Sequence, residues 1–168
     1  MPNVYLCASI ANAQVNSRIG SELRRAGFEV FDPCTIHPRH TDKIYFPEQV
    51  FAACRQAIER CDVLLVFLDS YGKDSAWEIG FARGLGKYVV GIVAGSSLFL
   101  QDWMVKFTVD HILILEGSWF HEIVESPEWA SIRDRSEMAE FDQIAPCIAA
   151  AFDARKCDLQ PVCRGDLP

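Results

Sequence analysis

Five short apolar runs, separated by segments with helical periodicity, constrain this chain more than any other feature of its sequence. The runs are rich in Val, Ile, Leu and Phe and span Val4–Ala8, Phe28–Phe31, Val63–Leu68, Tyr88–Val93 and His111–Leu115. Strands that read as nearly continuous apolar runs are typical of parallel sheets with helices on both faces. The alternation therefore predicts an α/β fold, a flavodoxin-like or Rossmann-like three-layer sandwich around a five-stranded, mostly parallel sheet.

The intervening helices are predicted at Ala13–Ala26, Pro47–Arg60 and Ser75–Leu85. Gly27 and Gly86 stand where helix C-caps are expected, and proline suits a first helical turn. After the fifth strand come Ser118–Glu125, Pro127 and a helical stretch from Glu128 to about Phe152. At 168 residues, the chain is expected to form a single domain over residues 1–155, followed by a mobile tail at 156–168.

Charge and cysteine content narrow the classes of partner. The chain has 16 Lys and Arg against 23 Asp and Glu, a net charge of -7, and no basic run. This composition argues against binding to nucleic acid, and no stretch is long and apolar enough to cross a membrane. Seven cysteines without a CxxC pair argue against a disulfide framework and against a zinc site, so a reducing cytoplasm is expected.

Polar residues gather where the predicted strands end. Ser9 follows the first strand, Asp69 ends the third, and Asp74 and Glu78 lie at the start of the next helix. In open α/β sheets, ligands bind beyond the carboxyl ends of the strands. Crowded carboxylates have divergent proton affinities, so one can donate a proton while another acts as nucleophile, as in glycosidic bond cleavage. The loop Asp32–Phe46, with His37, Arg39 and His40, either covers this site or is a solvated surface loop.

Structural roles are open for the same carboxylates. The segment Ser75-Ala-Trp-Glu78 matches a capping box, in which serine and glutamate satisfy backbone N–H groups at a helix start. Asp69 can be an ordinary loop acid, and Asp74 a residue favoured by the helix dipole. The pattern alone does not decide between capping and chemistry for Glu78.

Four segments together resemble the nucleoside 2-deoxyribosyltransferase family, whose related members include nucleotide N-glycosidases. They are "VYLCASI", "GFEVFDP", "AIERCDVLLVFLD" and "SAWEIGFARGLGKYVV", spread over about Val4 to Leu115. The last is similar to the family's small-x-x-Glu-x-Gly-x-Ala segment, and by that match Glu78 corresponds to the nucleophile that attacks the anomeric carbon. Tyr5 matches the tyrosine near the nucleophile, with a half-buried strand aromatic as the alternative.

A second match implies an oligomer. In "DWMV", Asp102 and Met104 resemble the polar-x-Met element that reaches into a neighbouring subunit's active site, so a homodimer or higher homo-oligomer is expected. Asp102 can accept from a 5'-hydroxyl but repels a 5'-phosphate, and Ala11 stands where nucleotide hydrolases have an arginine. Both departures favour nucleosides over nucleotides. The alternative is that Asp102 is a solvated loop acid and Met104 a core filler.

The base side departs from the family pattern. Cys54 and Gly72 occupy positions where family members commonly have aspartates that recognise or protonate the base. A thiol cannot replace a carboxylate directly, so either Asp69 or Asp74 is expected to take this role. Trp77 and Tyr71 can offer stacking faces for the base or pack inward.

The resemblance implies a retaining reaction on a 2'-deoxynucleoside without metal or organic cofactor. Glu78 forms a glycosyl ester, and a second nucleobase then takes the sugar. The first alternative is a nucleoside or nucleotide hydrolase, and the second is a binding module for a nucleoside-like ligand without catalysis. A third is a flavodoxin-like domain with an unrelated ligand, although the chain lacks GxGxxG and the P-loop lysine motif.

Overall fold

The computed structural model describes residues 2–7, 9, 13–36, 46–95, 98–116, 127 and 130–159. Its centre is a six-stranded sheet in the order β2-β1-β3-β4-β5-β6, and all five neighbouring pairs are parallel. The strands are β1 (Asn3–Cys7), β2 (Glu29–Phe31), β3 (Val63–Phe67), β4 (Tyr88–Val93), β5 (His111–Leu115) and β6 (Ser136–Ala139). The α/β three-layer class is confirmed, with six strands in place of the predicted five.

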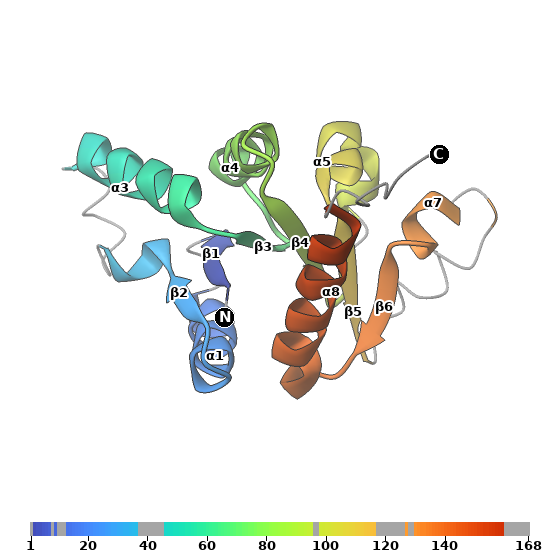
Figure 1. Cartoon of the computed structure of the whole chain (residues 1–168). Helices are drawn as coiled ribbons and strands as arrows, with labels where there is room; N and C mark the ends of the chain where they lie inside the picture. The colour runs from blue at the N-terminus through green and yellow to red at the C-terminus, as the bar shows by residue number, and fades with distance from the viewer. Residues whose placement is uncertain are drawn as a thin grey trace, which may run out of the picture.

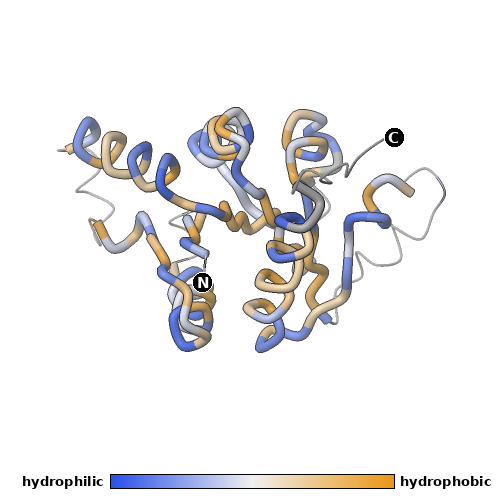
Figure 2. Tube along the Cα trace, in the orientation of Figure 1, coloured by the Kyte–Doolittle hydropathy of each residue, from blue (hydrophilic) through white to orange (hydrophobic). Residues whose placement is uncertain are grey.

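Helices cover both faces of this sheet, as Figure 1 shows. Its α-helices are α1 (Ala13–Arg25), α3 (Pro47–Arg60), α4 (Lys73–Gly84), α5 (Trp103–Thr108), α7 (Ala130–Arg133) and α8 (Ile144–Leu159), and its 3-10 helices are η2 (Pro33–Thr35), η3 (Leu98–Gln101) and η5 (Phe141–Gln143). The first face carries α3, α4 and α5, and the opposite face carries α1 and α8. Figure 2 shows that apolar residues follow the strands and α8.

The two faces of the sheet bury two separate apolar cores. One core packs Tyr5, Leu64 and Val66 against Ile58 of α3 and Ile79 of α4. The other packs the alternate residues of the same strands against α1 and α8. Because successive side chains of a strand point to opposite faces, strands buried on both sides must be apolar at every position. This is why the four inner strands β1, β3, β4 and β5 could be located from the sequence.

The region after β5 corrects the sequence prediction. A continuous helix from Glu128 to about Phe152 was predicted, but β6 lies inside this range and α8 begins only at Ile144. The strand is an edge strand with a single buried residue, Ala139, so it has no apolar run to reveal it. Helix α8 continues to Leu159, past the predicted domain boundary at residue 155. Residues 160–168 of the predicted tail lie outside the described residues.

Two helix ends agree with their predicted caps. Gly27 and Gly86 follow α1 and α4 with φ angles of 93° and 71°, in the left-handed region that glycine enters without steric cost. Their N–H groups donate to carbonyls of the preceding helical turn, at Arg24 and Arg83. The predicted C-caps are thereby confirmed.

The strand order places a crevice between β1 and β3. From β1 the chain moves outward to β2, and then returns to the other side of β1 to form β3. In doubly wound sheets, such a reversal of strand order opens a crevice at the carboxyl ends, where ligands bind. No helix in the described ranges combines the length and apolar character needed to cross a bilayer.

Candidate active site

A hydrogen bond between Tyr5 and Glu78 lies at this crevice. The Tyr5 hydroxyl on β1 donates to Glu78 Oε1 on α4 over 2.8 Å. The tyrosine is fully buried and its ring stacks on Phe31, with 5.6 Å between the centroids. Burial and, next, the charge of Glu78 raise the pKa of Tyr5 far above its ordinary value. The phenol therefore remains protonated and serves as a fixed donor to the carboxylate.

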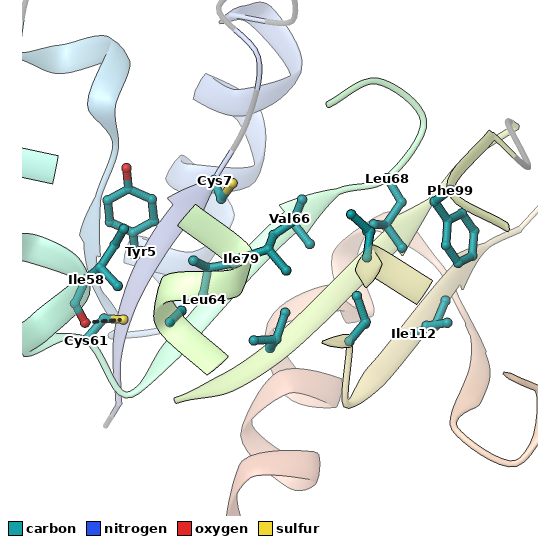
Figure 3. Packing of buried hydrophobic residues seen from close by; sticks show 14 of the residues in the cluster. Tyr5, Cys7, Ile58, Cys61, Leu64, Val66, Leu68, Ile79, Phe99 and Ile112 are labelled. Carbon is teal, nitrogen blue, oxygen red and sulfur yellow. Dashed lines mark hydrogen bonds between the residues drawn. The ribbon is translucent and has the colours of Figure 1, made fainter. Parts of the chain in front are cut away.

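Cys7 is a neighbour of this pair that the sequence analysis missed. Its thiol is buried and donates to the Ser75 carbonyl over 3.8 Å. Burial and then the Glu78 carboxylate raise the pKa of Cys7 well above its ordinary value, so it remains a neutral thiol. Figure 3 shows Tyr5 and Cys7 on β1 within the same buried cluster as Ile79. The signal was available, because residues two apart on a strand share a face.

The start of α4 excludes the capping box. The helix begins at Lys73 with Gly72 as N-cap and without a capping hydrogen bond from a side chain. Ser75 therefore lies within the first helical turn, where it is buried, rather than before the helix. A capping box requires the serine at the N-cap position. The capping interpretation of Glu78 is wrong, and its carboxylate instead pairs with Tyr5 across to β1.

A cleft of about 450 Å³ opens between the N-terminal halves of α3 and α4. Four of the predicted site residues line it, namely Cys54, Asp74, Trp77 and Glu78. Three further lining residues, Pro47, Val50 and Phe51, were not predicted. Phe51 could have been found from its spacing, because residues three apart on a helix share a face and Cys54 was already a candidate.

The two candidate aspartates have different surroundings. Asp74 is exposed in the first turn of α4 and lines the cleft together with Glu78. The carboxylate of Asp69 instead accepts from the backbone N–H groups of Ala94 and Gly95, at 2.6 and 2.5 Å. Asp69 thus holds the loop after β4 against the end of β3, and it is absent from the described lining of the cleft.

A second hydrogen bond joins Tyr71 to Asp102. The Tyr71 hydroxyl donates to Asp102 Oδ2 over 3.1 Å, connecting the loop before α4 to the start of α5. Burial and this hydrogen bond raise the pKa of Tyr71 to about 12, so the phenol stays a donor at neutral pH. Both side chains are half-buried, and neither is a fully solvated group.

The remaining predicted residues have simpler environments. Met104 lies on α5 with 81% of its surface exposed, so it is not a core filler within this chain. Ser9 is half-buried, and its carbonyl accepts from the Asn16 side chain over 3.0 Å. Ala11, His37, Arg39 and His40 lie outside the described residues. The described cysteines, at positions 7, 34, 54, 61 and 147, form no disulfide.

The architecture defines an α/β protein with a cleft beside the switch point of its parallel sheet. A sequence profile described as nucleoside 2-deoxyribosyltransferase matches residues 4–112. The chain belongs to this family, which confirms the resemblance drawn from its segments. Membership supports an enzyme that acts on the glycosidic bond of nucleosides.

Several solved structures also match this chain. The chain is similar to the CMP N-glycosidase BcmB of Clostridium botulinum, at 20% sequence identity and a TM-score of 0.48. The matched region covers 74% of this chain and 99% of that chain. No curated protein matches the sequence significantly.

Proposed function

We propose that the protein cleaves the N-glycosidic bond of 2'-deoxynucleosides and transfers the sugar to another nucleobase. The observation that carries this proposal is the Glu78 carboxylate, which lines the cleft while the buried Tyr5 hydroxyl donates to one of its oxygens. A carboxylate held by a fixed donor keeps a defined orientation toward the cleft that it lines. Such positioning of a nucleophile supplies a large part of the rate in covalent catalysis.

In the first step, a Glu78 oxygen attacks C1' of the sugar and the bond from C1' to the base nitrogen breaks. The electron pair of that bond goes to the departing base, which takes up a proton from Asp74 or from water held by it. In the second step, a nitrogen of the incoming base attacks C1', the ester bond breaks, and Glu78 is released as a carboxylate. The proton of the incoming nitrogen returns to Asp74, so the cycle closes without net change.

Asp74 supports this proton transfer better than Asp69 does. Asp74 lines the same cleft as Glu78, whereas both Asp69 oxygens accept backbone hydrogen bonds elsewhere. A general acid must come within hydrogen-bond reach of the leaving atom. The assignment of the proton donor to Asp74 therefore rests on its position in the cleft. If water attacks the glycosyl ester in place of a second base, the same intermediate leads to hydrolysis.

The direct test is intact mass spectrometry with peptide mapping after brief exposure to a panel of 2'-deoxynucleosides, with free base measured in parallel. An adduct of one deoxyribosyl unit on the Glu78 peptide is expected. Adding a second base then separates transfer from hydrolysis by its products. Neither an adduct nor released base across the panel would contradict catalysis on deoxynucleosides and support the binding-module alternative.

The Tyr5 hydroxyl gives a smaller and separate prediction. Tyr5→Phe removes the donor that orients the Glu78 carboxylate, and a misplaced nucleophile costs about a hundredfold in rate. Stopped-flow measurement of base release compares the variant with the parent protein. Base release at the parent rate would argue against the role given to Tyr5.

We further propose a homodimer or larger oligomer in which Asp102 and Met104 complete the site of a neighbouring subunit. Family membership supports this arrangement, as does the exposure of Met104 beside Trp103 and Phe107 on α5. These three large apolar side chains are uncovered by the described part of their own chain. A carboxylate at position 102 then favours a substrate with a free 5'-hydroxyl.

The charge of Asp102 can be tested by substrate choice. Asp102→Ser removes the repulsion of a 5'-phosphate, so the preference for nucleosides over 5'-monophosphates should fall by about tenfold or more. Steady-state kcat/KM for a matched nucleoside and monophosphate pair measures this ratio. Asp153→Ser, an exposed site on α8, changes net charge equally and should leave the ratio unaltered. Equal effects of both substitutions would show that overall charge, not position 102, sets the preference.

A further inference from the structure

The outer wall of the cleft is aromatic. Phe51 of α3 and Trp77 of α4 line it with their ring centroids 5.4 Å apart and their planes tilted by 48°. Both rings are substantially exposed, at 53% and 44%, although each lies in a well-defined helix. Large exposed aromatic rings beside a cleft are characteristic of ligand contact surfaces.

Trp77 is held in place from behind. Its indole stacks on Phe81, one helical turn further along α4, at 5.0 Å between centroids and 13° between planes. This contact covers one face of the indole and fixes its orientation before any ligand arrives. A surface that is already ordered loses little conformational entropy on binding, so the stack increases the affinity available to a ligand.

Few groups near this wall can read the edge of a base. Of the residues that line the cleft, Asp74 and Glu78 carry carboxylates, and the proposed mechanism uses both. The others present apolar carbon, the Cys54 thiol and the indole N–H of Trp77. A thiol is a weak hydrogen-bond partner. Recognition through donors and acceptors on the base is therefore sparse among the described residues, whereas aromatic surface is abundant.

We propose that Phe51 and Trp77 bind the departing base by ring contact, and that this wall selects two-ring bases over one-ring bases. This inference rests on the proposed function for the identity of its ligand. The ring separation of 5.4 Å is shorter than the roughly 7 Å that a sandwiched base requires, twice a van der Waals contact of about 3.5 Å. The base therefore stacks on one ring and meets the other ring at an angle, in the edge-to-face arrangement that aromatic groups favour.

Selection by ring area has a defined chemical consequence. Every base has an aromatic face, so stacking tolerates changes at the edge of the ring while responding to its size. A two-ring compound without exocyclic amine or carbonyl groups should bind nearly as well as a purine. A pyrimidine, with half the rings, should bind less well. If hydrogen bonds to the edge of the base dominated instead, the pyrimidine would bind more tightly than the two-ring compound without edge groups.

The test is calorimetric binding of adenine, cytosine and benzimidazole to the Glu78→Gln protein, which removes turnover from the measurement. Benzimidazole is expected to bind within about tenfold of adenine, and cytosine more weakly than both, because face contact dominates. Phe51→Ala in this background should weaken adenine binding by about 5- to 150-fold. Phe51→Leu, which keeps apolar bulk without a ring, should weaken it similarly, whereas Phe51→Tyr should retain it.

Calorimetric binding of adenine also supplies the control and the outcomes that would contradict the inference. Leu85→Ala removes an exposed apolar side chain at the far end of α4 and should leave binding unchanged. Unaltered adenine binding in Phe51→Ala, full binding in Phe51→Leu, or no binding of any base by the folded protein would overturn the inference. If base binding depends on Phe51 but the wild-type protein releases no base from deoxynucleosides, the aromatic wall stands and the proposed function fails.

Discussion

Replacing Glu78 by glutamine is expected to lower the rate of base release by roughly 10⁴- to 10⁶-fold, as removal of a covalent nucleophile does in other enzymes. The amide is nearly isosteric and can still accept a hydrogen bond from the Tyr5 hydroxyl, so the fold should persist. It cannot form a glycosyl ester. Loss of activity without loss of structure separates a chemical role from a structural one.

Two measurements accompany this variant. Single-turnover base release gives the rate, and thermal unfolding compares its stability with the parent protein. Glu59→Gln serves as the matched control, since Glu59 lies on α3 in an exposed pair with Arg55 at 3.7 Å, and exposed pairs contribute little. Activity within tenfold of the parent in Glu78→Gln would end the assignment of the nucleophile. A deoxyribosyl adduct on another peptide would identify its replacement.

The sequence located the central strands because burial on both faces demands apolar residues at every position. Strand β6 escaped prediction since burial acts on it weakly, with Ala139 as its one buried residue. The opposite edge strand, β2, was predicted because Val30 and Phe31 pack against the two cores. The error thus came from the lack of an apolar run in β6, rather than from the reading of periodicity in general.

Part of the candidate site could also be predicted from the sequence, because it follows an apolar strand. Glu78, Asp74 and Trp77 were found because they follow directly after an apolar strand at a helix start. The partnership of Tyr5 with Glu78 was available only through the family resemblance, because their separation by 73 positions is bridged by the packing of α4 over β1. The capping alternative failed because the motif does not fix where the helix begins, and α4 starts before Ser75.

The aspartates illustrate what spacing alone cannot resolve. Asp69 and Asp74 flank Gly72 in the sequence and were equivalent candidates for handling the base. Their surroundings differ, since the backbone N–H groups of Ala94 and Gly95 donate to Asp69. These partners lie 25 and 26 residues away, beyond any local pattern. The surroundings of Asp69 therefore depend on a tertiary contact that its neighbours in sequence do not reveal.

Asp74→Asn is expected to slow release of unmodified bases by about 10²- to 10⁴-fold, the range attributed to a general acid. The effect should depend on the leaving group. A 7-methylated purine deoxynucleoside carries a positive charge on its base and departs neutral without taking up a proton. Its release should slow by less than about tenfold in the same variant, because general acid catalysis contributes little to a leaving group that needs no proton.

Asp69→Asn distinguishes proton transfer from loop support. An asparagine offers one acceptor oxygen where Asp69 offers two, so one of the two backbone N–H groups loses its partner, at a cost of about 1–3 kcal/mol in unfolding free energy. The variant should therefore unfold at lower temperature while slowing both classes of substrate to the same extent. Measured side by side, the two variants assign the proton to one residue. The opposite result would be that Asp69→Asn slows release of unmodified bases but not of the methylated base, while Asp74→Asn slows both. The proton donor would then be Asp69, and the loop after β4 would have to rearrange to release its carboxylate for catalysis.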